Sequence, residues 1–255
     1  MPQAYFRFYA ELNDFLPRER QQVGFDYAFN GSPSVKDSIE ALGVPHTEVD
    51  LILVNGESVD FSYQLNDGDR VSVYPVFEAL DITPLLRVRP KPLRVTRFVC
   101  DVHLGTLARY LRMLGFDTLY PEDYDDANLA RISREERRIL LTRDRGLVKR
   151  GIVTHGYCVR DTDPERQLLE VVRRFDLYRS LEPFKRCMKC NGVLERVPKE
   201  DILERLPPKT AQYYDEFHEC EGCGQLYWRG SHYERMQGLI DEILAQEPGD
   251  EADDA

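Results

Sequence analysis

The sequence predicts three folded modules: an α+β domain, an α/β domain with a parallel sheet, and a small metal-binding module with a closing helix. Three patterns in the 255 residues predict them. Strand and helix signals follow the order β-β-α-β-β before residue 80, strands alternate with helices between residues 97 and 174, and two Cys-x-x-Cys pairs follow. Strand–helix alternation is typical of a parallel sheet covered on both faces. The predicted limits are residues 1–80, 95–182 and 183–245, with a linker at 81–94 and an acidic disordered tail at 246–255.

The first module alternates polar and apolar residues as strands do. Its expected elements are strands at 5–9 and 23–29, a helix at 34–42, and strands at 51–54 and 70–74. Ser34 or Ser32 is available to cap the helix, and Asn55-Gly56 is a strong signal for a hairpin turn. The order resembles a ubiquitin-like β-grasp fold, as in sulfur carrier proteins. Those carriers end in an exposed Gly-Gly, whereas this chain continues as Tyr74-Pro-Val-Phe-Glu78. Carrier chemistry is therefore not expected. We expect instead that this domain interacts with a protein partner.

The charge is unevenly distributed along the chain. The net charge of −11 argues by itself against a polyanionic partner. Residues 1–80 have a net charge of −8, residues 81–182 of +4 and residues 183–255 of −7. A basic, arginine-rich middle permits nucleic-acid binding at that segment, and solvated helix faces explain the same charges equally well. No apolar run is long enough for a membrane span and no export leader is evident, so a cytoplasmic protein without membrane contact is expected.

The middle module is expected to place acidic residues at one edge of its sheet. Its predicted strands are 98–100, 118–120, 139–142 and 157–159, and its predicted helices are 104–114, 127–137 and one opened by Pro164. Ligands of open α/β sheets bind outside the carboxyl ends of the strands. The acids at these ends are Asp101, Asp126 and Asp144, with Asp161 or Asp163 as a fourth.

Several carboxylates that converge need a cation, and Mg²⁺ or Mn²⁺ prefers oxygen ligands. Such ions orient an attacking water and neutralise charge in phosphodiester hydrolysis. Taken alone, each acid is better explained as a helix cap or a turn residue than as a site residue. Asp101, Asp126 and Asp144 together favour a catalytic site.

Basic residues near these acids are expected to bind nucleic-acid phosphates, because arginine pairs with phosphate bidentately. The predicted phosphate-binding residues are Arg109, Arg112, Arg143, Arg145, Lys149 and Arg150. Arg109 and Arg112 are three residues apart and are expected on the helix face opposite the leucines. Cys100 and Cys158 lie within strands and are expected to be buried apolar residues.

The C-terminal module contains four cysteines, Cys187, Cys190, Cys220 and Cys223, in two pairs separated by 29 residues. A glycine close after each pair permits a tight turn at the sulfur atoms. Four thiolates suit a closed, structural Zn²⁺ site, while a redox dithiol, two disulfides or iron are the alternatives. The separation exceeds the common spacing of roughly 15–20 residues, so a helical insertion is expected at 197–206. Residues 231–244 predict the closing helix.

Two stretches of the middle module carry a resemblance to a known family. They are Phe98-Val-Cys-Asp-Val-His-Leu-Gly-Thr-Leu-Ala-Arg-Tyr-Leu-Arg-Met-Leu-Gly-Phe-Asp117 and Arg138-Ile-Leu-Leu-Thr-Arg-Asp-Arg-Gly-Leu147. With the cysteine pairs, they resemble PIN-like ribonucleases, and more closely the RNase domain named for the C-terminal region of the Mut-seven exonuclease. Prokaryotic members of that family join this domain to a ubiquitin-like domain. The resemblance extends from Met1 to about Leu244.

The resemblance implies an α/β/α PIN-like fold followed by a zinc ribbon. It also implies that Asp101, Asp126 and Asp144, with Asp161 as a fourth acid, bind catalytic Mg²⁺ or Mn²⁺. The predicted function is a metal-dependent ribonuclease. A non-catalytic RNA-binding or adaptor protein and a structure-specific DNA nuclease are the alternatives.

Overall fold

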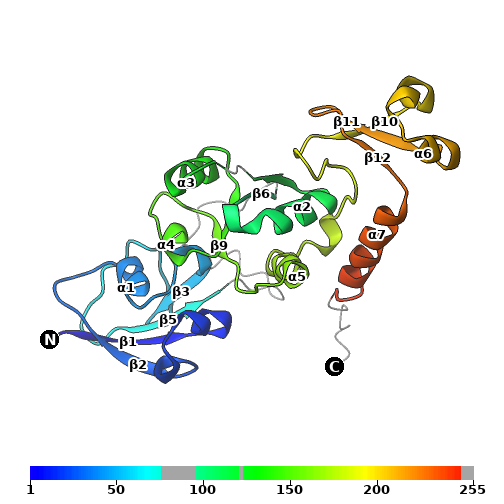
Figure 1. Ribbon diagram of the computed structural model, residues 1–255. Coiled ribbons are helices and arrows are strands. Elements are labelled where there is room, and N and C mark those ends of the chain that lie inside the picture. Colours follow the sequence, from blue (N-terminus) through cyan, green and yellow to red (C-terminus); the bar gives the residue numbers. More distant parts are fainter. Residues whose placement is uncertain (76–95, 121–122, 248–255) are drawn as a thin grey trace. The chain divides into compact units, whose positions relative to one another are not determined.

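The computed structural model describes residues 1–75, 96–120 and 123–247 (Figure 1). The chain divides into two compact units, Met1–Thr96 with Asp123–Val159, and Arg97–Glu122 with Arg160–Ala255. The predicted linker at 81–94 lies outside the described residues, and so does the predicted tail from residue 248 onward. The predicted domain limits stay a prediction. Within the described ranges, we find no helix with the length and apolar character needed to cross a membrane.

The first unit contains a mixed five-stranded sheet with the strand order β2-β1-β5-β3-β4. Its strands are β1 (Gln3–Phe8), β2 (Gly24–Ala28), β3 (Leu51–Val54), β4 (Glu57–Ser58) and β5 (Arg70–Tyr74). Strand β1 pairs antiparallel with β2 and parallel with β5, and β5 pairs antiparallel with β3. Helix α1 (Val35–Ala41) follows β2. This arrangement fits a ubiquitin-like fold and confirms the prediction for the N-terminal module.

Local sequence signals explain these elements. Burial alternates along β1, so Phe6 and Phe8 lie in the core while their neighbours face outward. The Ser34 hydroxyl accepts a hydrogen bond from the Asp37 amide at 3.1 Å, which identifies Ser34 as the cap of α1. Asn55 and Gly56 have φ values of 53° and 91°, as the tight turn between β3 and β4 requires.

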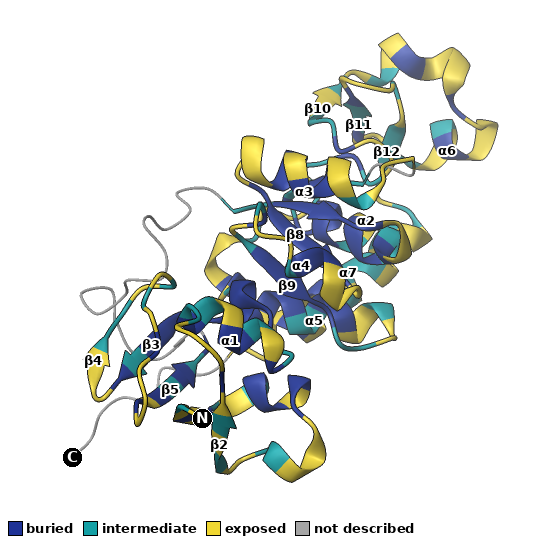
Figure 2. Ribbon diagram, turned by 90° about the vertical axis from the view of Figure 1, so that its left-hand side faces the viewer, coloured by how far each residue is buried: buried dark blue, intermediate teal, exposed yellow. Residues whose placement is uncertain are grey.

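The same unit continues with two parallel strands and two helices. These elements are α3 (Asp126–Glu135), β8 (Ile139–Thr142), α4 (Arg145–Val148) and β9 (Gly156–Cys158). Strand β8 pairs with β9 from Leu140↔Gly156 to Thr142↔Cys158, and all of its residues are buried (Figure 2). Val148 and Cys158 belong to the same apolar cluster as the core of the N-terminal sheet. The two parts of the first unit therefore share one core.

The second unit contains another parallel pair, β6 (Arg97–Cys100) and β7 (Asp117–Leu119). Helix α2 (Gly105–Met113) connects the two strands and packs against α5 (Pro164–Arg174). Short 3-10 helices lie at Val102–Leu104 and Tyr178–Ser180. Parallel strands with connecting helices fit the predicted α/β PIN-like domain.

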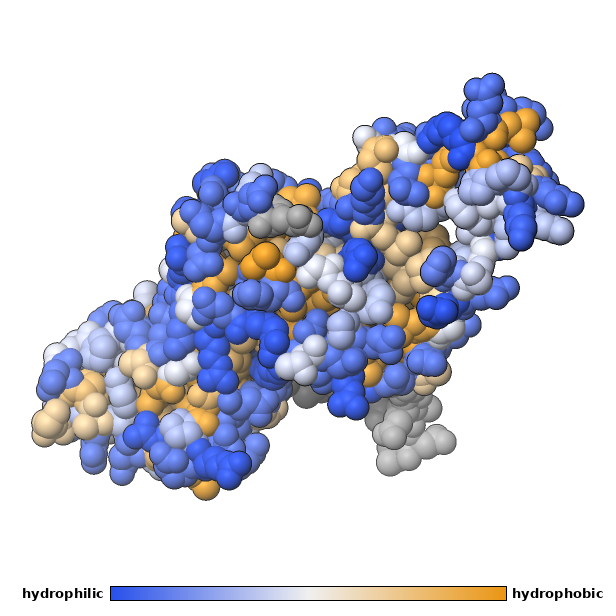
Figure 3. Space-filling model, viewed as in Figure 1, coloured by the Kyte–Doolittle hydropathy of each residue, from blue (hydrophilic) through white to orange (hydrophobic). Residues whose placement is uncertain are grey.

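The C-terminal part of the second unit is an antiparallel sheet of three strands. They are β10 (Leu194–Val197), β11 (Phe217–Cys220) and β12 (Leu226–Trp228), followed by helix α7 (Ser231–Leu244). The insertion between β10 and β11 is helical as predicted and comprises the 3-10 helix Lys199–Arg205 and α6 (Pro208–Tyr213). Ile202 and Leu206 of the insertion form a small core with Phe217 of β11. Figure 3 shows hydrophobic residues gathered over this sheet.

Candidate functional site

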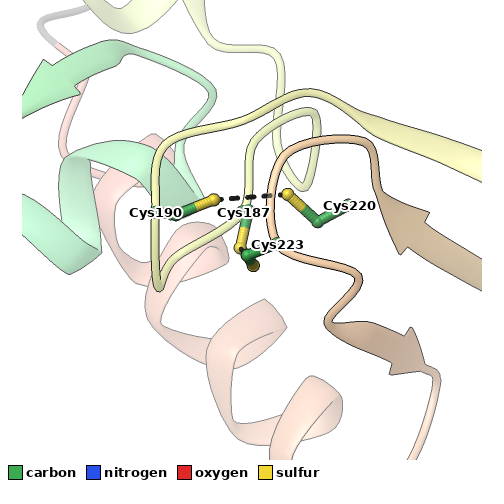
Figure 4. A group of neighbouring side chains, drawn as sticks. All are labelled: Cys187, Cys190, Cys220 and Cys223. Carbon is green, nitrogen blue, oxygen red and sulfur yellow. Dashed lines mark hydrogen bonds between the residues drawn. The ribbon is translucent and has the colours of Figure 1, made fainter.

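The four predicted cysteines form one cluster (Figure 4). Their four sulfur atoms all lie within 4.8 Å of one another, and none of the six cysteines forms a disulfide. The Sγ atoms of Cys187 and Cys223 are 3.7 Å apart, and those of Cys190 and Cys220 are 3.3 Å apart. Thiolates around tetrahedral zinc, with bonds of about 2.3 Å, lie about 3.8 Å from one another. The spacing therefore fits a four-thiolate metal site.

Glycine and backbone amides shape the first cysteine loop. A Cβ atom on Gly192 would lie 2.8 Å from the Cys220 sulfur, which is too close for any side chain. The Gly192 amide donates to the Cys190 sulfur at 3.5 Å, and its carbonyl accepts from the Cys187 amide at 2.8 Å. This is the tight turn that the glycine after the first pair predicts.

Hydrogen bonding favours the thiolate form of one ligand. Burial opposes ionisation of Cys187, but hydrogen bonds from the Tyr227 hydroxyl, 3.1 Å from the sulfur, and from the amides of Cys190 and Lys189 outweigh it. The pKa of Cys187 falls to about 7. Burial, together with the neighbouring thiols, raises the pKa of Cys190 to about 12. A bound cation would favour all four thiolates.

Two buried polar side chains attach this loop to the α/β part of the second unit. Arg112 donates to the carbonyl oxygens of Thr118, Met188 and Lys189 at 2.8, 3.2 and 3.0 Å. The Asn191 amide group accepts from the Thr118 amide at 2.9 Å. Through its side-chain nitrogen, Asn191 also donates to Asp117 Oδ1 at 2.7 Å.

The prediction that Arg112 lies on the exposed face with Arg109 is wrong. Arg112 is only 4% exposed, whereas Arg109 is exposed. The physical reason is that three carbonyl acceptors, two of them from the cysteine loop, surround the Arg112 guanidinium. Arg112 therefore cannot form part of an exposed RNA-binding rim.

Asp101 and Asp144 occupy equivalent places after parallel strands. Asp101 directly follows β6, is buried, and accepts from the Val102 amide at 2.6 Å. Asp144 is the second residue after β8, is exposed, and caps α4 by accepting from the Gly146 amide at 2.6 Å. Both acids make the local cap contacts that the structural alternative predicts. A cap contact does not exclude metal binding, because a carboxylate has two oxygens.

The cap of α3 is Asp125, and Asp126 begins the helix. The Asp125 carboxylate accepts from the Asn128 amide at 2.8 Å. The explanation of Asp126 as a helix cap is therefore wrong. Asp126 pairs instead with Arg150 at 3.3 Å, and both side chains are substantially exposed.

The two candidates for the fourth acid differ in their local contacts. Asp163 caps α5 by accepting from the amides of Glu165 and Arg166 at 3.1 Å. Asp161 accepts from the amides of Thr162 and Asp163 at 2.7 and 2.9 Å. Asp163 thus has the ordinary helix-start role, and Asp161 precedes the helix.

Asp101 and Asp161 belong to the second unit, whereas Asp126 and Asp144 belong to the first. The convergence of these acids stays a prediction.

The other predicted RNA-binding residues have different surroundings. Arg143 is exposed, like Arg109. Arg145 is also exposed, and its guanidinium lies 5.0 Å from the centre of the Phe15 ring. Lys149 is half-buried and donates to the Glu40 carbonyl at 3.1 Å.

Cys100 and Cys158 are buried, as predicted. No local sequence pattern indicates the contacts of Asn191 or of the N-terminal residues His46 and Glu48, because their partners are distant in sequence.

Comparison with known proteins identifies the family. Residues 96–240 match the model of the Mut7-C RNAse domain, and residues 1–81 match the model of the Mut7-C ubiquitin domain. A human protein, "Exonuclease mut-7 homolog", is 29% identical over 174 residues, which cover 64% of this chain and 18% of the human protein. The chain thus spans less than a fifth of that relative's length. No solved structure matches this chain. Because the RNAse-domain match covers more than half of the chain, this protein belongs to the Mut7-C RNAse domain family.

Proposed function

We propose that this protein is a metal-dependent ribonuclease that hydrolyses RNA phosphodiester bonds. The observation that carries the proposal is the position of Asp101 and Asp144, each at the carboxyl end of a parallel strand in a Mut7-C RNAse domain. The exonuclease activity in the name of the human relative supports a nuclease, and its extension to this chain is part of the proposal.

In this proposal, carboxylate oxygens of Asp101, Asp126, Asp144 and Asp161 hold Mg²⁺ or Mn²⁺. The bound ion would supply charge neutralisation and a more acidic water. Asp144 is the acid most accessible to a substrate, because it is exposed and caps α4 through a single oxygen. The exposed guanidinium of Arg143, next to it in sequence, suits an RNA phosphate.

The four cysteines have a separate role in this proposal. They would hold a structural Zn²⁺, because a site closed by four thiolates has no position left for water. RNA is the proposed substrate, and the ubiquitin-like domain is proposed as a protein-interaction module.

The test measures cleavage of mixed RNA substrates with Mn²⁺ by the wild type and by Asp144→Asn and Asp126→Asn. We expect each substitution to reduce cleavage at least about a hundredfold, because asparagine removes the ligand charge. Asparagine is also a good helix cap, so Asp144→Asn should preserve α4. The matched control is Asp125→Asn, which changes the neighbouring acid and retains the cap of α3. It should cleave as the wild type does.

Cleavage that survives both EDTA and Asp144→Asn would overturn the mechanism. If RNA is bound and never cleaved, the protein is an RNA-binding adaptor. A matched DNA oligonucleotide cleaved faster than the RNA would identify a DNA nuclease instead.

A further inference from the structure

A short 3-10 helix of the ubiquitin-like domain, η3 (His46–Glu48), contacts β9, which pairs with the strand β8 that leads to Asp144. Glu48 is completely buried, and its Oε1 accepts from the Cys158 amide at 2.6 Å. The next amide along the strand, that of Val159, donates in the other direction to the Thr142 carbonyl. Successive amides of a strand point to opposite edges, so Glu48 occupies the outer edge of β9, where a neighbouring strand would pair.

His46 makes a second side-chain contact with the backbone near β9. Its Nε2 lies 2.9 Å from the Val153 carbonyl oxygen, and the histidine is 6% exposed. A carbonyl oxygen only accepts, so Nε2 must carry the hydrogen. The other ring nitrogen lies 2.6 Å from Glu40 Oε1, near the end of α1. The ring therefore joins α1 to the loop between α4 and β9.

Helix α4 is held from both ends by the N-terminal domain. The Lys149 ammonium donates to the Glu40 carbonyl at 3.1 Å, a favourable position for a cation at a helix C-terminus. Arg145 stacks on Phe15. Between them, Val148 lies in the apolar core of the N-terminal sheet. Helices α1 and α4 are neighbours in both views (Figures 1 and 2).

We infer that the ubiquitin-like domain is an internal brace for the Asp144 loop, with Glu48 and His46 as positioning residues. Asp144 is the cap of α4, so any shift of α4 displaces its carboxylate. The catalytic consequence rests on the proposed function, whereas the brace itself does not. The surface of the ubiquitin-like domain around His46 and Glu48 is thus already occupied by residues 153–158 of the same chain.

Hydrogen exchange on the full-length protein tests the brace. Glu48→Ala removes the acceptor of the Cys158 amide, so exchange at residues 144–158 should rise roughly tenfold or more. Glu48→Gln retains an oxygen that can accept from the Cys158 amide, so residues 144–158 should keep most of their protection from exchange. It therefore controls for misfolding of Glu48→Ala. The matched control is Ser34→Ala, which removes the cap at the far end of α1. It should raise exchange in the first turn of α1 and leave residues 144–158 unchanged.

Cleavage assays on the same variants test the positioning role. Glu48→Ala should lower kcat at least about tenfold, since it displaces Asp144, and any rise in KM caused by the neighbouring Arg143 should be smaller. Unchanged exchange in Glu48→Ala, or equal changes in Ser34→Ala, would overturn the brace whatever the activity. A normal kcat with altered exchange would overturn the positioning role. A wild type that cuts no RNA but shows the expected exchange pattern refutes the proposed function and leaves the brace intact.

Discussion

Two buried polar residues, Arg112 and Asn191, show how much a single side chain contributes to the second unit. Each satisfies backbone groups that are otherwise sealed from water, and each joins segments more than 70 residues apart. The helical pattern around Arg112 reveals its neighbours on α2 but not the carbonyls of the cysteine loop. Its burial therefore could not be predicted from periodicity, whereas the clustering of the four cysteines could be predicted from their spacing.

Replacement of Arg112 by methionine should lower the free energy of unfolding by about 3 kcal/mol, because it leaves buried carbonyl oxygens without a donor. Methionine keeps the unbranched chain, so packing changes little. Chemical denaturation of the full-length protein measures the effect. Arg109→Met, in the same helix at an exposed position, is the control and should change stability by less than about 0.5 kcal/mol. Equal effects of the two substitutions would refute the role assigned to Arg112.

At the scale of elements, strong local signals predicted structure well. The alternation along β1, the Asn55-Gly56 turn and the helix cap at Ser34 each appear where they were expected. Helix α4 and η3 are too short to show a period, so no pattern predicted them. Both elements take part in the contacts between the ubiquitin-like domain and residues 144–158, which is why the sequence suggested separate modules.

The end of α2 depends on Gly115 in two ways. Its φ of +98° is unfavourable for other residues, and an added Cβ would overlap the Glu182 carbonyl. Gly115→Ala should therefore reduce the free energy of unfolding by about 2 kcal/mol or more. Gly238 in α7 is the matched control, since a Cβ there meets nothing within 4 Å. Gly238→Ala should increase stability by up to about 1 kcal/mol. Urea unfolding distinguishes the two, and a neutral Gly115→Ala would contradict the assigned strain.

At the scale of the whole molecule, the charge of the ubiquitin-like domain acquires a structural meaning. The domain is acidic overall, which does not suit RNA, and two of its acids are used within the first unit. Glu40 faces His46, and Glu48 binds the edge of β9. In the basic middle segment, Arg145 and Lys149 likewise contact the N-terminal domain, at Phe15 and at the Glu40 carbonyl. Net charge alone therefore overstates both the acidity available to partners and the basic surface available to RNA.

Metal removal should affect the second unit as a whole rather than the cysteine loop alone. Chelation of the proposed zinc releases the loop, and Asn191 transmits the change to the Thr118 amide of β7. We expect hydrogen exchange at Thr118 to increase together with exchange in β11, while Phe6 in β1 stays protected. Asn191→Ala in the zinc-loaded protein is the control, and it should expose Thr118 without affecting β11. If Thr118 remains protected after elemental analysis shows that the zinc is gone, the cysteine loop folds independently of β7.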